Sequence, residues 1–277
     1  MNIQDFRIHD TEAGFSLIRK SRAPTNPERH FHSSYELFYM ISGERTFFYG
    51  KDTFSVKAGD FLCIKPGVLH RGLNKNKEIC ELFNVYFDDS TSPYFTAILP
   101  LLLALTESGN PVLSLRFDDR SRIQKIFTDI ALELDVKKAG YIQLVWSLLF
   151  RCLVEMVRYV PSGSDSPCES AMNGKIRDSL DWLAHHFREP VTLKRIAEKF
   201  DISETYFSRL FRSTTHFSFI EYLNALRVQE ACRLLRSTRK TATEISLECG
   251  FGSVTQFGRR FRKITGGSPL SYRKGEA

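Results

Sequence analysis

Four residues near the start of the chain have the types and spacing of a site for a metal or a polar ligand. The pattern His30-x-His32-x3-Glu36 is followed, 34 residues further on, by His70. Side chains two residues apart point to the same face of a strand, so the first three should share a face, and a second hairpin can bring His70 across to them. Imidazoles with one carboxylate are common ligands of iron, manganese, nickel and zinc. The spacing predicts a divalent metal site or a metal-free effector site.

A second set of chemically useful residues lies in an internal repeat near the other end of the chain. The segment 207–212 (FSRLFR) recurs at 257–262 (FGRRFR). In each copy we expect a short helix, a tight turn and a second helix that begins at a serine N-cap, which is the plan of a helix-turn-helix. With its two phenylalanines facing inward, each second helix turns four polar residues outward. These are Thr205, Ser208, Arg209 and Arg212 in the first copy and Thr255, Gln256, Arg259 and Arg262 in the second.

The outward residues fit the chemistry of DNA recognition. Arg209 and Arg259 are placed to bind guanine O6 and N7 or a phosphate, and Gln256 could read adenine. The helix N-termini, with Ser203 and Ser253, suit phosphate groups. The alternative is that the arginines form a solvated face and that Gln256 only caps its helix.

Two differently built regions must position these residues. From about residue 6 to residue 88, short runs rich in Phe, Tyr, Val and Ile alternate with glycine-containing turns, which predicts an all-β sandwich or barrel. Residues 93–160 read as helices. The Pro-, Ser- and Gly-rich segment 161–174 reads as a linker, and residues 175–274 read as helices again. We therefore expect three regions, 1–92, 93–160 and 175–274. The linker 161–174 joins the second region to the third.

Two apolar stripes mark the middle helices. Either they belong entirely to the core of one chain, or part of each stripe meets a second subunit and forms a homodimer. The first stripe is Ile123, Ile126, Phe127, Ile130 and Leu134, and the second is Ile142, Val145, Leu148, Leu149 and Cys152.

Charge and composition narrow the class of protein. Residues 174–277 hold 19 Lys+Arg against 11 Asp+Glu, a net of +8, whereas residues 1–173 hold 20 against 21, a net of −1. A basic excess confined to one domain favours a polyanionic partner. The six cysteines are scattered without a C-x-x-C pair, the first twelve residues do not resemble a signal peptide, and the longest apolar stretch, 141–160, contains Arg151, Glu155 and Arg158. We expect a cytoplasmic protein with reduced thiols and no membrane partner.

The quoted C-terminal stretches resemble the DNA-binding region of the AraC/XylS family of bacterial transcription regulators. The matching segments are 192–200 (TLKRIAEKF), 203–212 (SETYFSRLFR), 249–251 (CGF) and 265–273 (TGGSPLSYR). The resemblance implies sequence-specific binding of double-stranded promoter DNA by two helix-turn-helix units, usually to activate transcription with RNA polymerase. It assigns base reading to Thr205, Ser208, Arg209, Thr255, Gln256 and Arg259. His216 departs from the family pattern, which has Gly there, and would need a turn that tolerates a left-handed backbone.

The histidine pattern and the glycines near it resemble the two cupin motifs. The resemblance implies a small jelly-roll barrel, which in AraC-like regulators precedes the DNA-binding region and binds a small effector, often a sugar. The fold class we expect is therefore multidomain: an N-terminal all-β cupin barrel with trailing helices and a C-terminal all-α tandem helix-turn-helix. The four candidate effector or metal ligands remain His30, His32, Glu36 and His70.

Three functions fit this arrangement. The first is a non-enzymatic regulator that responds to an effector. The second is a metal-dependent cupin enzyme with a DNA-binding tail, although no nucleophile–base pair or phosphate-binding loop supports it elsewhere in the sequence. The third is a DNA-binding protein whose barrel has only a structural role.

Overall fold

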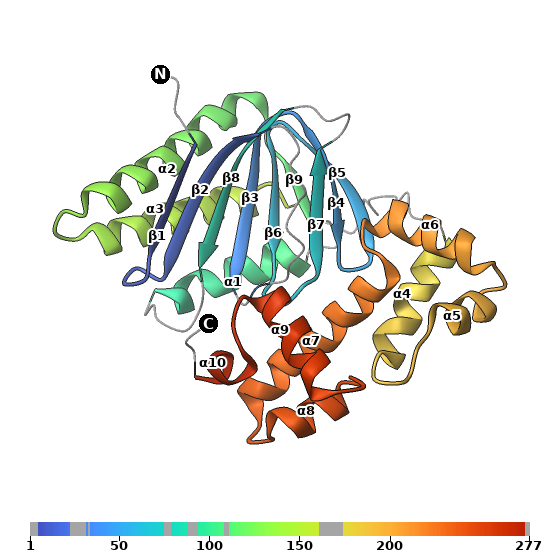
Figure 1. Cartoon of the computed structure of the whole chain (residues 1–277). Helices are drawn as coiled ribbons and strands as arrows, with labels where there is room; N and C mark the ends of the chain where they lie inside the picture. Colours follow the sequence, from blue (N-terminus) through green and yellow to red (C-terminus); the bar gives the residue numbers. More distant parts are fainter. Residues whose placement is uncertain are drawn as a thin grey trace.

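Strands dominate the chain up to residue 87, and helices dominate it from residue 94 on (Figure 1). The computed structural model describes residues 5–22, 32, 34–74, 79–87, 94–107, 111–160 and 174–274. The strands are β1 (Phe6–Asp10), β2 (Phe15–Arg22), β3 (Tyr35–Ser42), β4 (Glu44–Tyr49), β5 (Asp52–Lys57), β6 (Asp60–Ile64), β7 (His70–Asn74), β8 (Cys80–Phe87) and β9 (Val112–Ser114).

The strands form two antiparallel sheets. The larger sheet has the order β1-β2-β8-β3-β6-β9, and the smaller has the order β5-β4-β7. Their facing surfaces enclose an apolar interior. This interior is made of Phe38, Met40, Phe47, Val56, Leu62, Ile64, Cys80 and Leu82. The predicted cupin-like β domain is therefore present.

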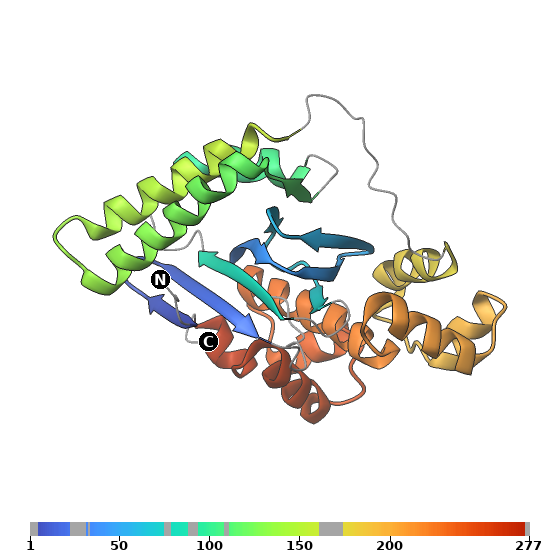
Figure 2. The same ribbon diagram turned by 90° about the horizontal axis from the view of Figure 1, so that it is seen from above.

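Three helices cover the other face of the larger sheet: α1 (Phe95–Glu107), α2 (Phe117–Val136) and α3 (Tyr141–Val157). Figure 2 shows α2 and α3 together on one side of the sheet, opposite the C-terminal helices. Side chains of alternate strand residues, such as Leu37, Tyr39 and Phe83, pack with these helices in one core. Eight residues of the two apolar stripes are fully buried in this core, and Ile142 and Leu148 are partly buried against it. Burial within one chain therefore accounts for both stripes.

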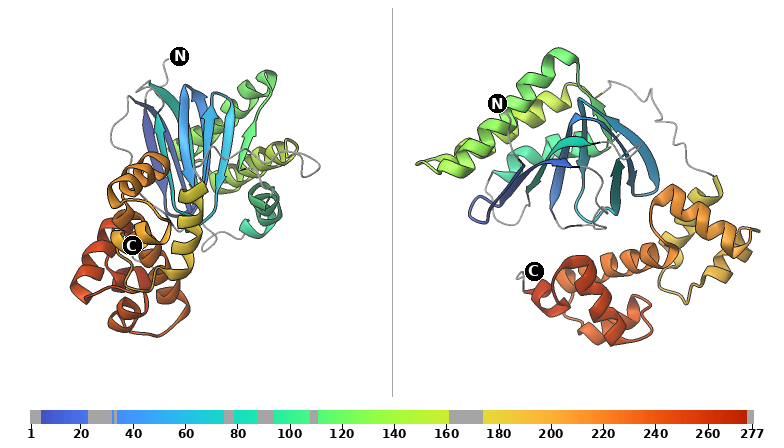
Figure 3. Two further views of the ribbon diagram at one scale, coloured as in Figure 1. Left: turned by 90° about the vertical axis from the view of Figure 1, so that its right-hand side faces the viewer. Right: turned by 45° about the horizontal axis from the view of Figure 1, so that its top comes forward.

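The C-terminal region consists of seven helices. They are α4 (Gly174–His186), α5 (Leu193–Lys199), α6 (Glu204–Thr215), α7 (Phe219–Ser237), α8 (Ala242–Glu248), α9 (Val254–Thr265) and α10 (Pro269–Arg273). The pairs α5–α6 and α8–α9 are the two predicted helix-turn-helix units, and α7 connects them (Figure 3). Capping boxes are formed at Ser218 and Thr241, and Ser253 caps α9 by accepting from the backbone N–H of Gln256.

The segment 93–160 differs from the expected organisation, and the linker 161–174 cannot be compared with it. The segment 93–160 is not purely helical, because β9 pairs with β6 at the edge of the larger sheet. The predicted linker lies outside the described residues except for Gly174, the first residue of α4. No helix in the described part of the chain is long and apolar enough to cross a membrane.

Candidate functional site

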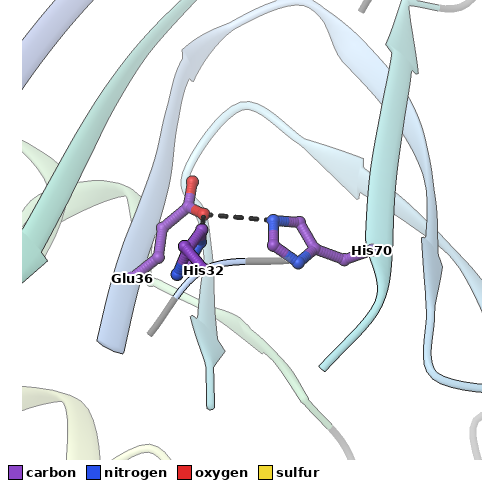
Figure 4. Close-up of side chains that lie close together, drawn as sticks. All are labelled: His32, Glu36 and His70. Atoms are coloured by element: carbon purple, nitrogen blue, oxygen red, sulfur yellow. Dashed lines mark hydrogen bonds and ion pairs between the residues drawn. The ribbon is translucent and has the colours of Figure 1, made fainter. Parts of the chain in front are cut away.

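Three of the four predicted ligands meet at one end of the barrel (Figure 4). The Nε2 atom of His32 lies 2.8 Å from Oε2 of Glu36, and the Nε2 atom of His70 lies 3.2 Å from the same oxygen. Glu36 is 3% exposed and His70 is 4% exposed. We call these three residues the histidine site. His30, the fourth predicted ligand, lies outside the described residues.

The elements that position the site differ partly from the expected ones. Glu36 is the second residue of β3 and His70 is the first residue of β7, so a hairpin strand does bring His70 across. His32, however, precedes β3, which begins at Tyr35. The shared strand face predicted for His32 and Glu36 is therefore wrong, although the two side chains still meet.

Two residues that the sequence reasoning missed complete the surroundings of Glu36. The hydroxyl of Tyr86 donates to Oε1 of Glu36 at 3.2 Å, and Asn84 donates to the Tyr86 oxygen at 3.0 Å. Both lie on β8, where Tyr86 pairs directly with Glu36 in the sheet. The alternation of polar Asn84 and Tyr86 with apolar neighbours along this strand was the available signal.

Glu36 stays ionised although it is buried. Burial alone raises the pKa of a carboxyl group, but the bonds from His32 and His70 outweigh this effect and hold the pKa of Glu36 well below its usual range. A buried carboxylate needs a compensating positive charge, which a proton or a metal ion can supply.

The Nδ1 atom of each imidazole, which faces away from Glu36, shows where the ring carries a proton. Nδ1 of His32 is 2.8 Å from the carbonyl oxygen of Ser34, and Nδ1 of His70 is 2.8 Å from that of Val68. A carbonyl oxygen only accepts, so each Nδ1 carries a proton. Each Nε2 then has two options: it carries a second proton and donates to Glu36, or, in the neutral ring, its lone pair binds a cation placed between the ring and the carboxylate, as in metal-ligating histidines. The donor set thus fits a divalent cation, whose ligand atoms all lie within 4.8 Å of one another.

The first helix-turn-helix unit presents the predicted polar face. Phe207 and Phe211 are fully buried. Arg209 is exposed, and the hydroxyl of Ser203 accepts from the backbone N–H of Tyr206, which fixes the start of α6. Of the remaining predicted DNA contacts of this unit, Thr205 and Arg212 are exposed and Ser208 is half-buried.

The second unit repeats this face. Phe257 and Phe261 are fully buried, and all five predicted contact residues of the unit are exposed: Ser253, Thr255, Gln256, Arg259 and Arg262. Among the described residues, no ion pair engages Arg209, Arg212, Arg259 or Arg262. Four uncompensated arginines on the two second helices make a surface that suits a polyanion.

Two family models match the chain. The AraC-like ligand binding domain matches residues 13–137, and a helix-turn-helix domain matches residues 196–275. The fold and these matches define a class of protein in which a ligand-binding barrel precedes a DNA-binding domain. The chain belongs to the AraC family of transcription regulators.

The relatives include regulators of very different length. The HTH-type transcriptional activator RhaS of Citrobacter koseri is 27% identical over 251 residues, which are 90% of this chain and 88% of RhaS. An uncharacterised HTH-type transcriptional regulator of Staphylococcus aureus is 31% identical over 126 residues, which are 46% of this chain and 17% of that protein. The chain therefore matches less than a fifth of the length of the Staphylococcus relative.

Solved structures give weaker likenesses. Apo ToxT from Vibrio cholerae is 12% identical, with 95% of this chain and 98% of ToxT covered, at a TM-score of 0.42. The DNA-binding domain of AdpA in complex with a target DNA is 31% identical, with 35% of this chain and 88% of that domain covered, at a TM-score of 0.35. These scores are too low to carry a structural argument, and the family assignment rests on the sequence matches.

Proposed function

We propose that this chain is a transcription regulator that binds double-stranded promoter DNA through both helix-turn-helix units and responds to a small effector in the barrel. The observation that carries the proposal is the repeated exposed face of α6 and α9, with Arg209 and Arg259 at matching positions. RNA polymerase is the second macromolecular partner of such a regulator, and activation is the expected outcome. The site of action is the bacterial cytoplasm, and no catalysed reaction is part of the proposal.

The connecting helix gives the two units a suitable separation. Helix α7 has 19 residues, which at 1.5 Å per residue corresponds to about 28 Å. Successive major grooves on one face of DNA lie about 34 Å apart. One chain could therefore place α6 and α9 in neighbouring grooves.

Binding of the purified protein to the DNA upstream of its own coding sequence tests this function. A scrambled fragment is the control, and the salt concentration is varied from about 50 to about 200 mM. We expect a preference of about a thousandfold or more, with a steep dependence on salt. Equal and weak binding to both fragments, with and without candidate sugars, would contradict the proposal.

For the barrel, we propose that the histidine site binds a divalent cation, with His32, Glu36 and His70 as protein ligands and the effector next to it. The support is the geometry: both Nδ1 atoms face backbone carbonyls, which leaves both Nε2 atoms directed at the Glu36 carboxylate. A proton on one or both Nε2 atoms would also satisfy this arrangement. A metal-dependent cupin enzyme is the alternative function that such a site would allow.

Metal analysis of the purified protein separates these cases. We expect about one iron, manganese, nickel or zinc ion per chain, lost in His70→Ala and retained in His185→Ala, which removes an exposed histidine of α4. Absence of metal, together with failure to bind any of the four ions in titration, would overturn the metal proposal and leave protons as the compensating charge. A turnover assay on the metal-loaded protein tests the enzyme alternative.

We also propose a homodimer formed through the hairpin of α2 and α3. The buried stripes are unavailable for this, but Leu132, Val136 and Leu144 on the outer surface of the hairpin are 58%, 48% and 44% exposed. Their apolar area would be removed from water in a dimer. Sedimentation at micromolar concentration should give the mass of two chains, and Leu132→Lys with Leu144→Lys should give the mass of one. A monomeric mass of the unaltered protein would exclude this interface.

A further inference from the structure

The outer face of the smaller sheet is packed against the first helix-turn-helix unit. Phe48 of β4 and Leu69, just before β7, belong to the same apolar cluster as the helices of the DNA-binding domain. The Phe48 ring lies 5.8 Å from the ring of Phe217, and the Arg71 guanidinium lies 5.6 Å from that ring. The guanidinium of Arg71 also donates to the backbone carbonyl of His216. We call these five residues the docking contact.

Three further polar contacts join the same two domains. The side chain of Gln229 donates to the carbonyl of Gly67 at 2.5 Å. Two ion pairs join the turn before β5 and its first residue to α4: Lys51 with Asp181 at 3.0 Å and Asp52 with Arg177 at 3.1 Å. Thus α4, α7 and the residue that follows α6 all contact the smaller sheet or its turns, and Figures 1 and 3 show these helices beside that sheet.

The repeat indicates that the docking contact is specific to the first unit. The segment 214–219 (TTHFSF) corresponds to 264–269 (ITGGSP) at an offset of 50 residues, so His216 and Phe217 stand where the second copy has Gly266 and Gly267. Phe217 is 1% exposed. On their polar faces the two copies share a serine N-cap, one threonine and two arginines, but they differ at the two positions through which the first copy meets the barrel.

Strand β7 connects the docking contact to the histidine site. In a strand, neighbouring side chains point to opposite faces. His70 therefore faces the barrel interior and Glu36, while Leu69 and Arg71 face the DNA-binding domain. The pairing with β4 follows the same division, because Tyr49 pairs with His70 and Phe48 pairs with Arg71.

We propose that β7 couples the histidine site to the docking contact, so that occupancy of the site controls how firmly the first helix-turn-helix unit is held against the barrel. This inference rests on the proposed function and specifies its regulation. The assembled site and the formed contact are both present in this structure, and under the proposed coupling each stabilises the other. By the reciprocity of linked equilibria, a change that disrupts one weakens the other.

Hydrogen–deuterium exchange on the full-length protein tests the docking contact and its coupling without DNA or effector. One variant, His216→Gly with Phe217→Gly, converts the end of the first unit to the sequence of the second. Arg71→Ala breaks the contact from the barrel side and keeps the test informative if the double variant does not fold. Both should raise exchange in residues 43–57 and in residues 210–222. If Arg71→Ala does not raise exchange in residues 210–222, and the double variant does not raise it in residues 43–57, the two domains are not docked.

The coupling is tested by His70→Ala, whose side chain lies on the other face of β7. We expect this variant to raise exchange in residues 210–222 as well as in the barrel peptides. Arg236→Ala is the matched control for Arg71→Ala, because Arg236 makes the same kind of cation–π contact, with the Tyr272 ring at 4.9 Å, inside the DNA-binding domain. A change confined to the barrel peptides in His70→Ala would overturn the coupling while leaving the docking contact intact.

A double-mutant cycle extends the test to DNA. His70→Ala should change the dissociation constant for the upstream DNA by about fivefold or more, which is the lower range of coupling between sites. The same substitution should have no effect in the protein that already carries Arg71→Ala. An effect of equal size in both backgrounds would place the coupling elsewhere. If no specific DNA binding occurs at all, the proposed function fails, whereas the exchange experiments still decide the coupling.

Discussion

The two helix-turn-helix units are alike on the polar faces of their second helices and different where the first of them meets the barrel. Helices α6 and α9 both have 12 residues, both begin at a serine N-cap and both end in a left-handed residue. That residue is His216 in the first unit, with φ 62°, and Gly266 in the second, with φ 85°. A left-handed backbone costs a residue other than glycine roughly 1 kcal/mol.

The comparison separates the residues that both units need from the residues that only the first unit uses. The polar face of the second helix and its two phenylalanines recur in both copies, because each copy needs the same core and the same kind of surface. At His216 the chain keeps a conformation that favours glycine, and its carbonyl accepts from Arg71 of the barrel. The strained residue thus lies at the contact between the domains.

The largest effect that we expect is the loss of stability when a buried ring is removed from the core of either unit. Phe211→Ala and Phe261→Ala each remove a fully buried ring, which should lower the free energy of unfolding by about 3–5 kcal/mol. The Phe211 ring also packs on Tyr222, which in turn contacts Phe48 of the barrel. Urea unfolding followed by circular dichroism, with exchange of the barrel peptides, should show that only Phe211→Ala loosens the barrel. Equal loosening by both variants would contradict a first unit docked alone.

The next effect concerns DNA. Arg209→Ala and Arg259→Ala should each weaken specific binding by about 1–3 kcal/mol and relax the preference at one base position if the guanidinium binds a guanine. Binding to a set of singly altered operators measures this, and Arg158→Ala, which removes an exposed charge near the end of α3, is the control. A uniform loss across all operators would identify the two arginines as phosphate contacts. A loss in only one variant would mean that a single unit reads bases.

Most of the C-terminal region could be predicted because its signals are local. N-caps, helix periodicity and the repeated segment lie within a few residues of the helices they define, and the short helix and second helix expected in each copy are present as α5–α6 and α8–α9. The histidine site could be predicted in part, because Glu36 and His70 follow from motif spacing.

The remaining features depend on contacts between distant residues. Strand β9 has only three residues and forms because it pairs with β6, about fifty residues earlier. Tyr86 reaches Glu36 through the register of β8 with β3. The docking contact joins Arg71 to His216, which are 145 residues apart. Nothing in the local sequence specifies such pairings. His216 and Phe217 lie at this contact, and the second copy has two glycines at the corresponding positions.

A smaller effect should distinguish the helices that follow the two units. Ser218 forms a capping box with Glu221 at the start of α7, and Ser268 forms one with Ser271 at the start of α10. Ser218→Ala should cost about 1 kcal/mol. Ser268→Ala should cost less, because α10 has five residues and its box contains no carboxylate to interact with the helix dipole. Thermal unfolding of both variants measures the difference, and an equal or larger loss for Ser268→Ala would contradict it.

The smallest expected effect is a pH dependence that only the first unit has. Burial and the nearby Arg71 lower the pKa of His216 below its ordinary value of 6.5. A histidine whose pKa is lower in the docked state stabilises that state above its ordinary pKa, and this stabilisation is lost as the pH falls below 6.5, because the undocked form takes up the proton more readily. Exchange in residues 43–57 should therefore rise between about pH 7.5 and about pH 5.5 after correction for the intrinsic exchange rate.

The control for this pH dependence is His216→Asn, since asparagine tolerates the left-handed backbone and does not titrate in this range. Subtracting its pH profile removes every contribution that does not come from residue 216. A remaining rise toward acid pH assigns the effect to the imidazole of His216. Identical profiles for the two proteins would show that His216 keeps one protonation state throughout, and the difference between the units would then be one of shape alone.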